Sequence, residues 1–547
     1  MKDLLVRGLP LILAGTVGIT GIVYATTAAS GADAHGYLAQ ADTLIHGHVR
    51  IEQPWAAAVP WPAASWTFSP LGYRPSSLGE EPWTIVPIYP PGLPMLFALA
   101  RVVGGQEAVF WVVPLAGAMF VLATASIARR LISPAGGIVA AWLVATSPAF
   151  LFMLVAPMSD VPVAAAWAVA FACLLERQRR RATLAGGAIG MAILIRPNLA
   201  PLAAVPALWY LVPALTGRMA VRREARVQGA LFSAGVAAGG AAIATFFTVV
   251  NGSPLTTGYG SMTGAFAVEH VAPNAALYLR WLVESHTPVV LFGMLALVLP
   301  LRWLWPAARE RLAFIVIGLF VAALWIFYWC YLVFDAWWYL RFLLPSWPFL
   351  MAGVAAAALA IARRGGRPAA IVMGGAIIAL GVWQVAVAAD RHVFDLWKNE
   401  RRYVSVAREV RRMVGRASVV YAMQHSGSVR YYGGRLSVRY DTMADPWIDR
   451  SVDWLAARGI RSYLLVDDWE VPLLRERFAG RRLVERLDDP PLLHYIGTSE
   501  VFLYDLSEPR DPLIPVVTVR DTYEDTRSVA PVRLPPIQFD ASSSTLP

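Results

Sequence analysis

The sequence has little charge and almost no cysteine. Only 15% of its 547 residues are charged, whereas 57% are hydrophobic, and the mean hydropathy is +0.52. Soluble globular chains carry about 25% charged residues, so this composition argues against a soluble enzyme and against a disordered protein. The two cysteines, Cys173 and Cys330, lie in apolar runs, so no disulfide framework is expected. The chain also lacks a P-loop and a dinucleotide-binding glycine motif.

The basic excess of the chain is confined to its hydrophobic part. The net charge is +10, and residues 1–389 contain 24 lysines and arginines against 14 acidic residues, whereas residues 390–547 contain 23 of each. A basic excess that lies between apolar segments is typical of membrane topology. It therefore argues against a nucleic-acid partner.

Long apolar runs predict a polytopic helical membrane protein. A helix needs about 20 apolar residues to cross a bilayer. We expect eleven spans, at residues 9–29, 107–128, 135–154, 161–175, 183–195, 199–215, 229–250, 288–305, 312–334, 342–362 and 369–389. Residues 90–105 are too short to span, and we expect an interfacial or re-entrant helix there. An alternative for residues 9–29 is a cleaved signal peptide, although their apolar run exceeds the usual length of about 7–15 residues.

The basic residues also predict the orientation of the chain. With the N-terminus in the cytoplasm, 18 of them fall on the inner side and six on the outer side. This distribution satisfies the positive-inside rule. With eleven spans, residues 390–547 then lie outside. The six outer basic residues are Arg50, Arg74, Arg101, Arg196, Arg280 and Arg341.

Two external regions are expected to carry structure. The first external loop, about residues 30–106, is rich in tryptophan over its first sixty residues and is too long for a simple connection. Residues 390–506 alternate between strand and helix patterns, which predicts a small α/β domain. We expect helices at 402–414, 447–458 and 469–478, and strands at 418–422, 462–466 and 501–504. Residues 507–547 are rich in proline and polar residues, and we expect a flexible tail.

Two carboxylates and two arginines stand at the external ends of spans. A carboxylate half shielded at the membrane surface, such as Asp33, is a usable proton acceptor, although it could also be a solvated loop acid. Asp160 could cap the following helix, or it could orient an acceptor or hold a cation. Arg341 and Arg196 are directional partners for a phosphate, and the alternatives for them are snorkelling or ion pairing.

Histidines are concentrated on the predicted external side. They are His35, His46, His48, His270 and His286. The Asp33-x-His35 spacing is compatible with a divalent metal, but it is a weak signal. A possible metal is thus the one cofactor indicated.

Three classes of function fit these features. The first is a membrane enzyme acting on a lipid-bound substrate, the second a transporter or flippase, and the third a sensor or scaffold. Transporters place charges at mid-membrane and show inverted repeats. Here the charges gather at span ends and on one face, which favours an enzyme.

Five segments resemble the GT-C class of membrane glycosyltransferases, the relatives of the protein mannosyltransferases and aminoarabinose transferases. They are the acidic motif and helix at 33–41, the second juxtamembrane helix at 89–96, the acidic loop at 158–162, the paired-span hinge at 190–198 and the Arg-aromatic-Leu-Leu-Pro segment at 340–345. Together they cover about residues 1–390. Many relatives have Asp-Glu at the first motif, whereas Ala34 follows Asp33 here.

The resemblance implies an inverting transfer of a sugar from a polyprenyl-phosphate donor. Asp33 would be the general base, Arg341 and Arg196 would hold the phosphate, and Asp160 would orient the acceptor or bind a metal. His35, Tyr37 and Tyr89 are further substrate-binding candidates. The implied partners are the lipid-linked donor, membrane lipid and a glycan, lipid or protein acceptor. The implied location is the plasma membrane of a bacterium, with the C-terminal domain outside.

Overall fold

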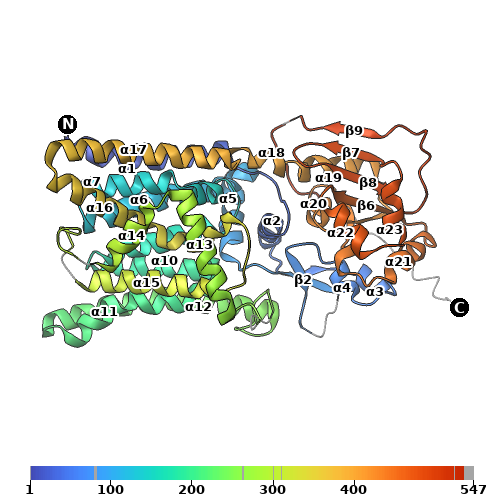
Figure 1. Ribbon diagram of the computed structural model, residues 1–547. Helices are drawn as coiled ribbons and strands as arrows, with labels where there is room; N and C mark the ends of the chain where they lie inside the picture. Colours follow the sequence, from blue (N-terminus) through green and yellow to red (C-terminus); the bar gives the residue numbers. More distant parts are fainter. Residues whose placement is uncertain are drawn as a thin grey trace.

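The computed structural model describes residues 2–78, 83–260, 264–299, 301–308, 311–522 and 524–534. A bundle of long helices occupies one end of the molecule, and an α/β domain occupies the other (Figure 1). The N-terminus lies at the end of the bundle farthest from this domain (Figure 1). The first external loop, drawn in blue, lies below and beside the α/β domain (Figure 1).

Each expected span overlaps one or two helices of the bundle. The helices are α1 (Lys2–Val23), α6 (Val112–Leu131), α7 (Pro134–Ala145), α8 (Pro148–Leu154), α9 (Asp160–Leu174), α10 (Arg179–Ile195), α11 (Ala204–Thr216), α12 (Met219–Asn251), α14 (Val289–Val298), α15 (Arg311–Trp329), α16 (Trp347–Arg364) and α17 (Gly366–Asp390). The short helices η1 (Pro197–Ala203) and η3 (Trp337–Ser346) precede α11 and α16.

Not all of these helices are long enough to count as complete spans. Within the described residues, six helices are long and apolar enough to cross a membrane, or eight if each of two bent pairs is one span. The second pair combines Val268–His286 with Val289–Val298 at 119°. Its first part contains η2 (Val268–His270) and α13 (Val271–His286), a helix that the hydropathy pattern did not predict. The count of eleven spans stays a prediction.

The helices α10 and α12 pack unusually closely because glycines face each other. A β carbon on Gly190 would lie 2.5 Å from the carbonyl oxygen of Gly235, too close for any side chain. Gly187, three residues earlier on α10, faces open space. Small residues at an interface between membrane helices allow such close backbone approach. This contact positions the C-terminal end of α10, where Arg196 lies.

The first external loop is folded. It contains α2 (Asp33–Ile45), α3 (Trp55–Ala58), α4 (Ala64–Thr67), α5 (Gly92–Val109) and an antiparallel sheet in the order β1-β3-β2. The strands are β1 (Ile51–Glu52), β2 (Tyr73–Pro75) and β3 (Thr84–Pro87). The expected helix at 90–105 corresponds to α5, which breaks at Gly105 and packs against α2 through an ion pair of 2.9 Å between Arg101 and Asp42.

The C-terminal domain is a six-stranded mixed sheet with the order β5-β4-β6-β8-β7-β9. Its strands are β4 (Ser418–Tyr421), β5 (Leu436–Val438), β6 (Arg461–Asp467), β7 (Leu493–Ile496), β8 (Val501–Asp505) and β9 (Val517–Arg520). The helices are α18 (Leu396–Glu400), α19 (Arg402–Met413), α20 (Ser426–Tyr431), α21 (Trp447–Ala456), α22 (Glu470–Arg477) and α23 (Arg482–Glu485). Short 3-10 turns are η4 (Val393–Asp395), η5 (Tyr440–Thr442) and η6 (Arg486–Asp488).

The six elements predicted for this domain are all present, within one or two residues. The flexible tail expected from residue 507 stays a prediction, although part of that segment forms regular structure. Residues 517–520 form β9, which pairs in parallel with β7, and the Thr526 hydroxyl lies 2.6 Å from that of Thr27. Backbone hydrogen bonds at a sheet edge hold this stretch although its composition is polar. Residues 535–547 of the predicted tail lie outside the described residues.

The C-terminal domain shares a core with the first loop. Trp55, Trp61 and Phe68 of the loop pack in one cluster with Val419, Leu436 and Trp454 of the domain. Arg430 of α20 reinforces this contact, because its guanidinium donates to Gln53 Oε1 at 2.8 Å and to the Phe68 carbonyl at 2.7 Å. The domain and the loop are therefore built as one unit around α2.

His35 of α2 lies inside this interface. It is 3% exposed, its Nδ1 lies 2.7 Å from the Leu71 carbonyl oxygen, and its ring is edge-on to Tyr431 of α20. Because a carbonyl can only accept, Nδ1 carries the proton of a neutral ring. Burial lowers the pKa of His35 to about 4, since the interface cannot solvate an imidazolium.

Replacing Gly190 should separate α10 from α12. We expect Gly190→Leu to lower the melting temperature clearly, because the larger side chain clashes with the Gly235 carbonyl. Gly187→Leu is the matched control, since it adds the same side chain on the same helix into open space. Thermal unfolding in detergent measures both. Equal melting temperatures for the two variants would contradict close packing at Gly190.

His35 should make the stability of the chain depend on pH. The unfolded chain binds a proton near pH 6.5 and the folded chain only near pH 4, so stability is complete above pH 6.5 and falls as the pH drops toward 4. The loss amounts to at most about 3 kcal/mol for a shift of this size. Thermal unfolding between pH 7 and pH 4 tests this. His35→Gln should flatten the dependence, whereas the exposed His48→Gln should retain it; parallel curves for wild type and His35→Gln would disprove the assignment.

Candidate active site

Asp33 begins α2, after the connecting segment 24–32 that follows α1. A carboxylate at a helix N-terminus is stabilised by the helix dipole. The Tyr89 hydroxyl donates a hydrogen bond of 2.5 Å to Asp33 Oδ1, and Arg341 Nη1 lies 3.7 Å from Oδ2. The side chain of Asp33 is 36% exposed. One carboxylate oxygen is therefore fixed by a phenol, while the other remains accessible beside a cation.

A glycine on α2 allows Tyr89 to reach Asp33. A β carbon on Gly36 would collide with the ring of Tyr89, so only glycine permits the ring to lie across the helix. The Tyr37 ring packs 4.6 Å from that of Tyr89, and the Tyr37 hydroxyl donates to Ser159 Oγ at 3.0 Å. Tyr37 and Tyr89, both predicted to contact substrate, thus hold Asp33 and the start of α9 in place.

Asp160 lies behind Asp33 and is fully buried. Its Oδ1 is 2.6 Å from Arg196 Nη2 and 3.9 Å from Arg341 Nε, and its side chain is 0% exposed. A carboxylate buried to this degree requires a paired cation. Asp160 is the first residue of α9, and Ser159 at the N-cap makes no side-chain cap bond. Asp160 is not among the described residues that line the cavity in front of Asp33.

The two arginines differ in how firmly they are held. Arg196 donates to Asp160 and also, through Nε at 3.1 Å, to Ser159 Oγ. Arg341 lies 3.7 Å or more from both carboxylates, and its buried Nε makes no hydrogen bond within the described residues. Arg196 is therefore committed to Asp160, whereas Arg341 retains donors for a ligand.

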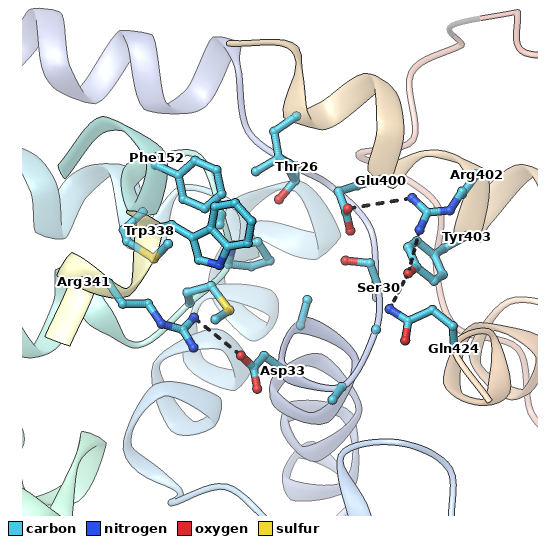
Figure 2. A pocket seen from close by; sticks show the side chains of 18 residues that line it. Thr26, Ser30, Asp33, Phe152, Trp338, Arg341, Glu400, Arg402, Tyr403 and Gln424 are labelled. Atoms are coloured by element: carbon cyan, nitrogen blue, oxygen red, sulfur yellow. Dashed lines mark hydrogen bonds and ion pairs between the residues drawn. The ribbon is translucent and has the colours of Figure 1, made fainter. Parts of the chain in front are cut away.

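A cavity of about 430 Å³ opens in front of Asp33 and Arg341. The segment 30–34 and residues before α9 form one side, and the C-terminal domain forms another. Figure 2 shows Asp33 and Arg341 together at one end, with Trp338 above Arg341 and Glu400 toward the C-terminal domain. Cavities of this size hold a substrate group of a few rings. The cavity is thus shared by both domains.

A metal centre is not supported at this site. The spacing of Asp33 and His35 is compatible with a metal site, but the His35 ring packs in the interface near Tyr431 and its Nδ1 lies 2.7 Å from the Leu71 carbonyl oxygen. Both Asp33 and Asp160 face arginines, whose positive charge opposes a cation. Within the residues that the structure describes, no three His, Cys, Asp or Glu side chains gather in a way that could hold a metal ion.

The contribution of the C-terminal domain was not foreseen from the sequence. Glu400, Arg402 and Gln424 line the cavity, together with Trp338 of the bundle. Arg402 is bound to the buried Asp467 by a hydrogen bond of 2.8 Å. An Asp directly after a predicted strand and an Arg pair at the start of a predicted helix were the available signals, but nothing local indicates that they meet.

Comparison with known proteins identifies the fold. The family model of dolichyl-phosphate-mannose-protein mannosyltransferases matches residues 89–250. The structure of ArnT from Cupriavidus metallidurans bound to undecaprenyl phosphate superposes with a TM-score of 0.56 at 12% identity, covering 92% of this chain and 99% of that one. No curated protein matches the sequence.

A second solved structure has the same fold. It is the archaeal oligosaccharyltransferase AglB from Archaeoglobus fulgidus, in complex with an inhibitory peptide and a dolichol-phosphate. Its TM-score is 0.51 at 13% identity, covering 87% of this chain and 70% of that one. The match to ArnT extends into the C-terminal domain, which the sequence motifs had left outside the resemblance. The resemblance to the GT-C class of membrane glycosyltransferases that these motifs indicated is thus confirmed, by a family match over residues 89–250 and a common fold over most of the chain.

Proposed function

We propose that this chain is a membrane glycosyltransferase that moves a sugar from a polyprenyl-phosphate donor to an acceptor hydroxyl with inversion. The observation that carries the proposal is the placement of an accessible carboxylate, Asp33, 3.7 Å from a guanidinium, Arg341, in one cavity. Such a pair supplies a base and an anion-binding group within reach of one reacting carbon.

The donor phosphate is assigned to Arg341. Among the described residues this guanidinium makes only long ion pairs, and it lies at the cavity, so a phosphate can accept from its N–H groups without breaking a hydrogen bond. Two proteins of this fold bind such lipids, ArnT with undecaprenyl phosphate and AglB with dolichol-phosphate. The lipid chain would follow the apolar helices of the bundle.

The reaction is a single displacement. The acceptor hydroxyl gives its proton to Asp33 Oδ2 while its oxygen attacks the anomeric carbon. The bond between that carbon and the phosphate oxygen breaks, and the electron pair leaves with the polyprenyl phosphate. Tyr89 holds Oδ1, so that Oδ2 faces the acceptor. Arg341 stabilises the charge that develops on the phosphate.

Asp160 and Arg196 act by positioning. Asp160 attracts both arginines and so sets the place of Arg341 relative to Asp33. The resemblance implies that Arg196 is a second phosphate ligand, but in this proposal Arg196 anchors Asp160. We further propose that the site faces the extracytoplasmic side of eleven spans, with the N-terminus in the cytoplasm, in accord with the distribution of basic residues.

Removing the base should abolish transfer. We expect Asp33→Asn to lower the rate by about 10²–10⁴, because the amide cannot accept the proton. The measurement is release of polyprenyl phosphate in detergent from a panel of polyprenyl-phosphate hexoses and pentoses mixed with acceptors. A transporter would need a sealed compartment, whereas this reaction does not.

Asp42→Asn is the matched control for the base, because Asp42 lies on the same helix and pairs with Arg101 away from the cavity. It should keep transfer close to that of wild type. Full activity of Asp33→Asn, or no release from any donor by the wild-type chain, would contradict the proposed function.

We expect the two arginines to have different roles, with Arg341 binding the phosphate of the sugar donor and Arg196 anchoring Asp160. Arg341→Gln should raise the KM for the donor and leave the melting temperature near wild type. Arg196→Gln should destabilise the fold by roughly 3 kcal/mol or more, because it leaves the buried Asp160 with only a distant partner. Adding Asp160→Asn to Arg196→Gln should restore part of the melting temperature. Donor titration and thermal unfolding measure these effects, and an unchanged donor KM in Arg341→Gln would remove Arg341 from the phosphate site.

A further inference from the structure

The C-terminal domain forms the wall of the cavity that faces away from Arg341. Glu400 ends α18 and Gln424 follows β4, and both line the cavity together with Ser30 of the first loop. Figure 2 shows the carboxylate of Glu400 beside Ser30, on the side opposite Trp338. Since Asp33 and Arg341 occupy the other end, this wall lies where an acceptor would enter.

Arg402, the cationic side chain on this wall, is not available to a ligand. Arg402 Nε donates to the buried Asp467 at 2.8 Å, Nη1 donates to the Asn399 carbonyl at 3.0 Å, and Nη2 donates to the Tyr403 hydroxyl at 3.1 Å. The side chain of Arg402 is only 7% exposed. Its charge is balanced by Asp467, so it serves to hold the wall together and not to attract an anion.

The groups that remain on the wall accept hydrogen bonds. Glu400 Oε1 is 3.9 Å from Arg402, beyond hydrogen-bond distance, and its side chain is 20% exposed. Gln424 Nε2 donates to the Tyr403 hydroxyl at 2.9 Å, which turns its amide so that Oε1 is left for another partner. A carboxylate and an amide oxygen are the acceptors that sugar hydroxyls use.

An aromatic side chain, Trp338, lies on the side of the cavity opposite Glu400 (Figure 2). Trp338 is 39% exposed, and one face of its indole stacks on Phe152 at 5.8 Å with an angle of 10°. Its size matches the apolar face of a sugar ring, and an indole fixed on one side loses little entropy when a ligand packs on the other.

We propose that Glu400 and Gln424 form an acceptor subsite for a neutral, hydroxyl-rich group, a glycan. The proposal rests on the proposed function. Both side chains accept hydrogen bonds from hydroxyls of the acceptor, and Trp338 packs against its ring. The carboxylate of Glu400, which has only a long ion pair of 3.9 Å with Arg402 among the described residues, disfavours an acceptor that carries a negative charge near the reacting hydroxyl, because like charges repel and Arg402 is already bound to Asp467.

The test compares neutral and charged acceptors on the purified full-length chain in detergent. The neutral probes are methyl hexosides and methyl pentosides, and the charged probe is methyl glucuronoside. Octyl hexosides represent a lipid-linked glycan, and a serine-rich peptide represents a protein acceptor. Transfer to each is measured with the donor that supports release of polyprenyl phosphate.

Wild type should use neutral glycosides and reject the glucuronoside. Glu400→Gln and Gln424→Ala should each raise the KM for the neutral acceptor by about tenfold, more than they change the release of polyprenyl phosphate to water. Glu400→Gln should also reduce the discrimination against the glucuronoside. A preference for octyl over methyl glycosides would identify a lipid-linked glycan as the source, and equal use would identify a free one.

The matched control is Glu508→Gln, which removes an exposed carboxylate of the same domain outside the cavity. It should change neither KM nor discrimination. The subsite is disproved if donor release persists while Glu400→Gln and Gln424→Ala leave acceptor KM unchanged, or if only the peptide is used. Absence of release from every donor would instead disprove the proposed function. Melting temperatures near wild type show that the variants are folded.

Discussion

The ion pair between the buried carboxylate of Asp160 and Arg196 is the interaction on which the site depends. An ionised carboxylate that is 0% exposed costs several kcal/mol unless a cation compensates it, so Arg196 must lie against it at 2.6 Å. Arg196 directly follows α10, Asp160 begins α9, and Arg341 lies in η3. One charge thus brings three separate elements to one point. Asp33 adds a second carboxylate, so that two acids and two arginines balance before any ligand binds.

The second constraint is the docking of the C-terminal domain on the first loop. In the part of the chain that the structure describes, Arg430 bonds only to neutral oxygens of Gln53, Phe68 and Ser437, which fixes its position without a competing carboxylate. His35, two residues after the first residue of α2, is enclosed in the same interface. The orientation of Asp33 is therefore set from both sides, by the bundle through Arg341 and Tyr89 and by the C-terminal domain through α2.

Much of this architecture is predictable from sequence because its signals are local. Apolar runs locate the helices of the bundle, and the alternating strand and helix patterns locate β4, β6 and β8. Because successive loops lie on opposite sides of a membrane, counting them predicts one common face for four side chains: Asp33, Asp160, Arg196 and Arg341. What escapes prediction depends on contacts distant in sequence. The short strands β5, β7 and β9 exist only through pairing, and β9 draws a polar segment into the sheet. Likewise, nothing local distinguishes Arg196 from Arg341, because the difference lies in which of them reaches Asp160.

The cavity is lined by both domains, and this division fits the chemistry proposed for it. In the proposed reaction a lipid phosphate would reach the site along the bundle and would need a cation that can release its carboxylate partners, as the long contacts of Arg341 allow. An acceptor would arrive from the aqueous side and meet a wall whose cation, Arg402, is already paired. If both walls offered free arginines, the phosphate could bind in either place, and Asp33 would lie beside the reacting carbon in only one of them. Pairing Arg402 with Asp467 therefore directs the donor to one end of the cavity and leaves the other end for hydroxyl groups.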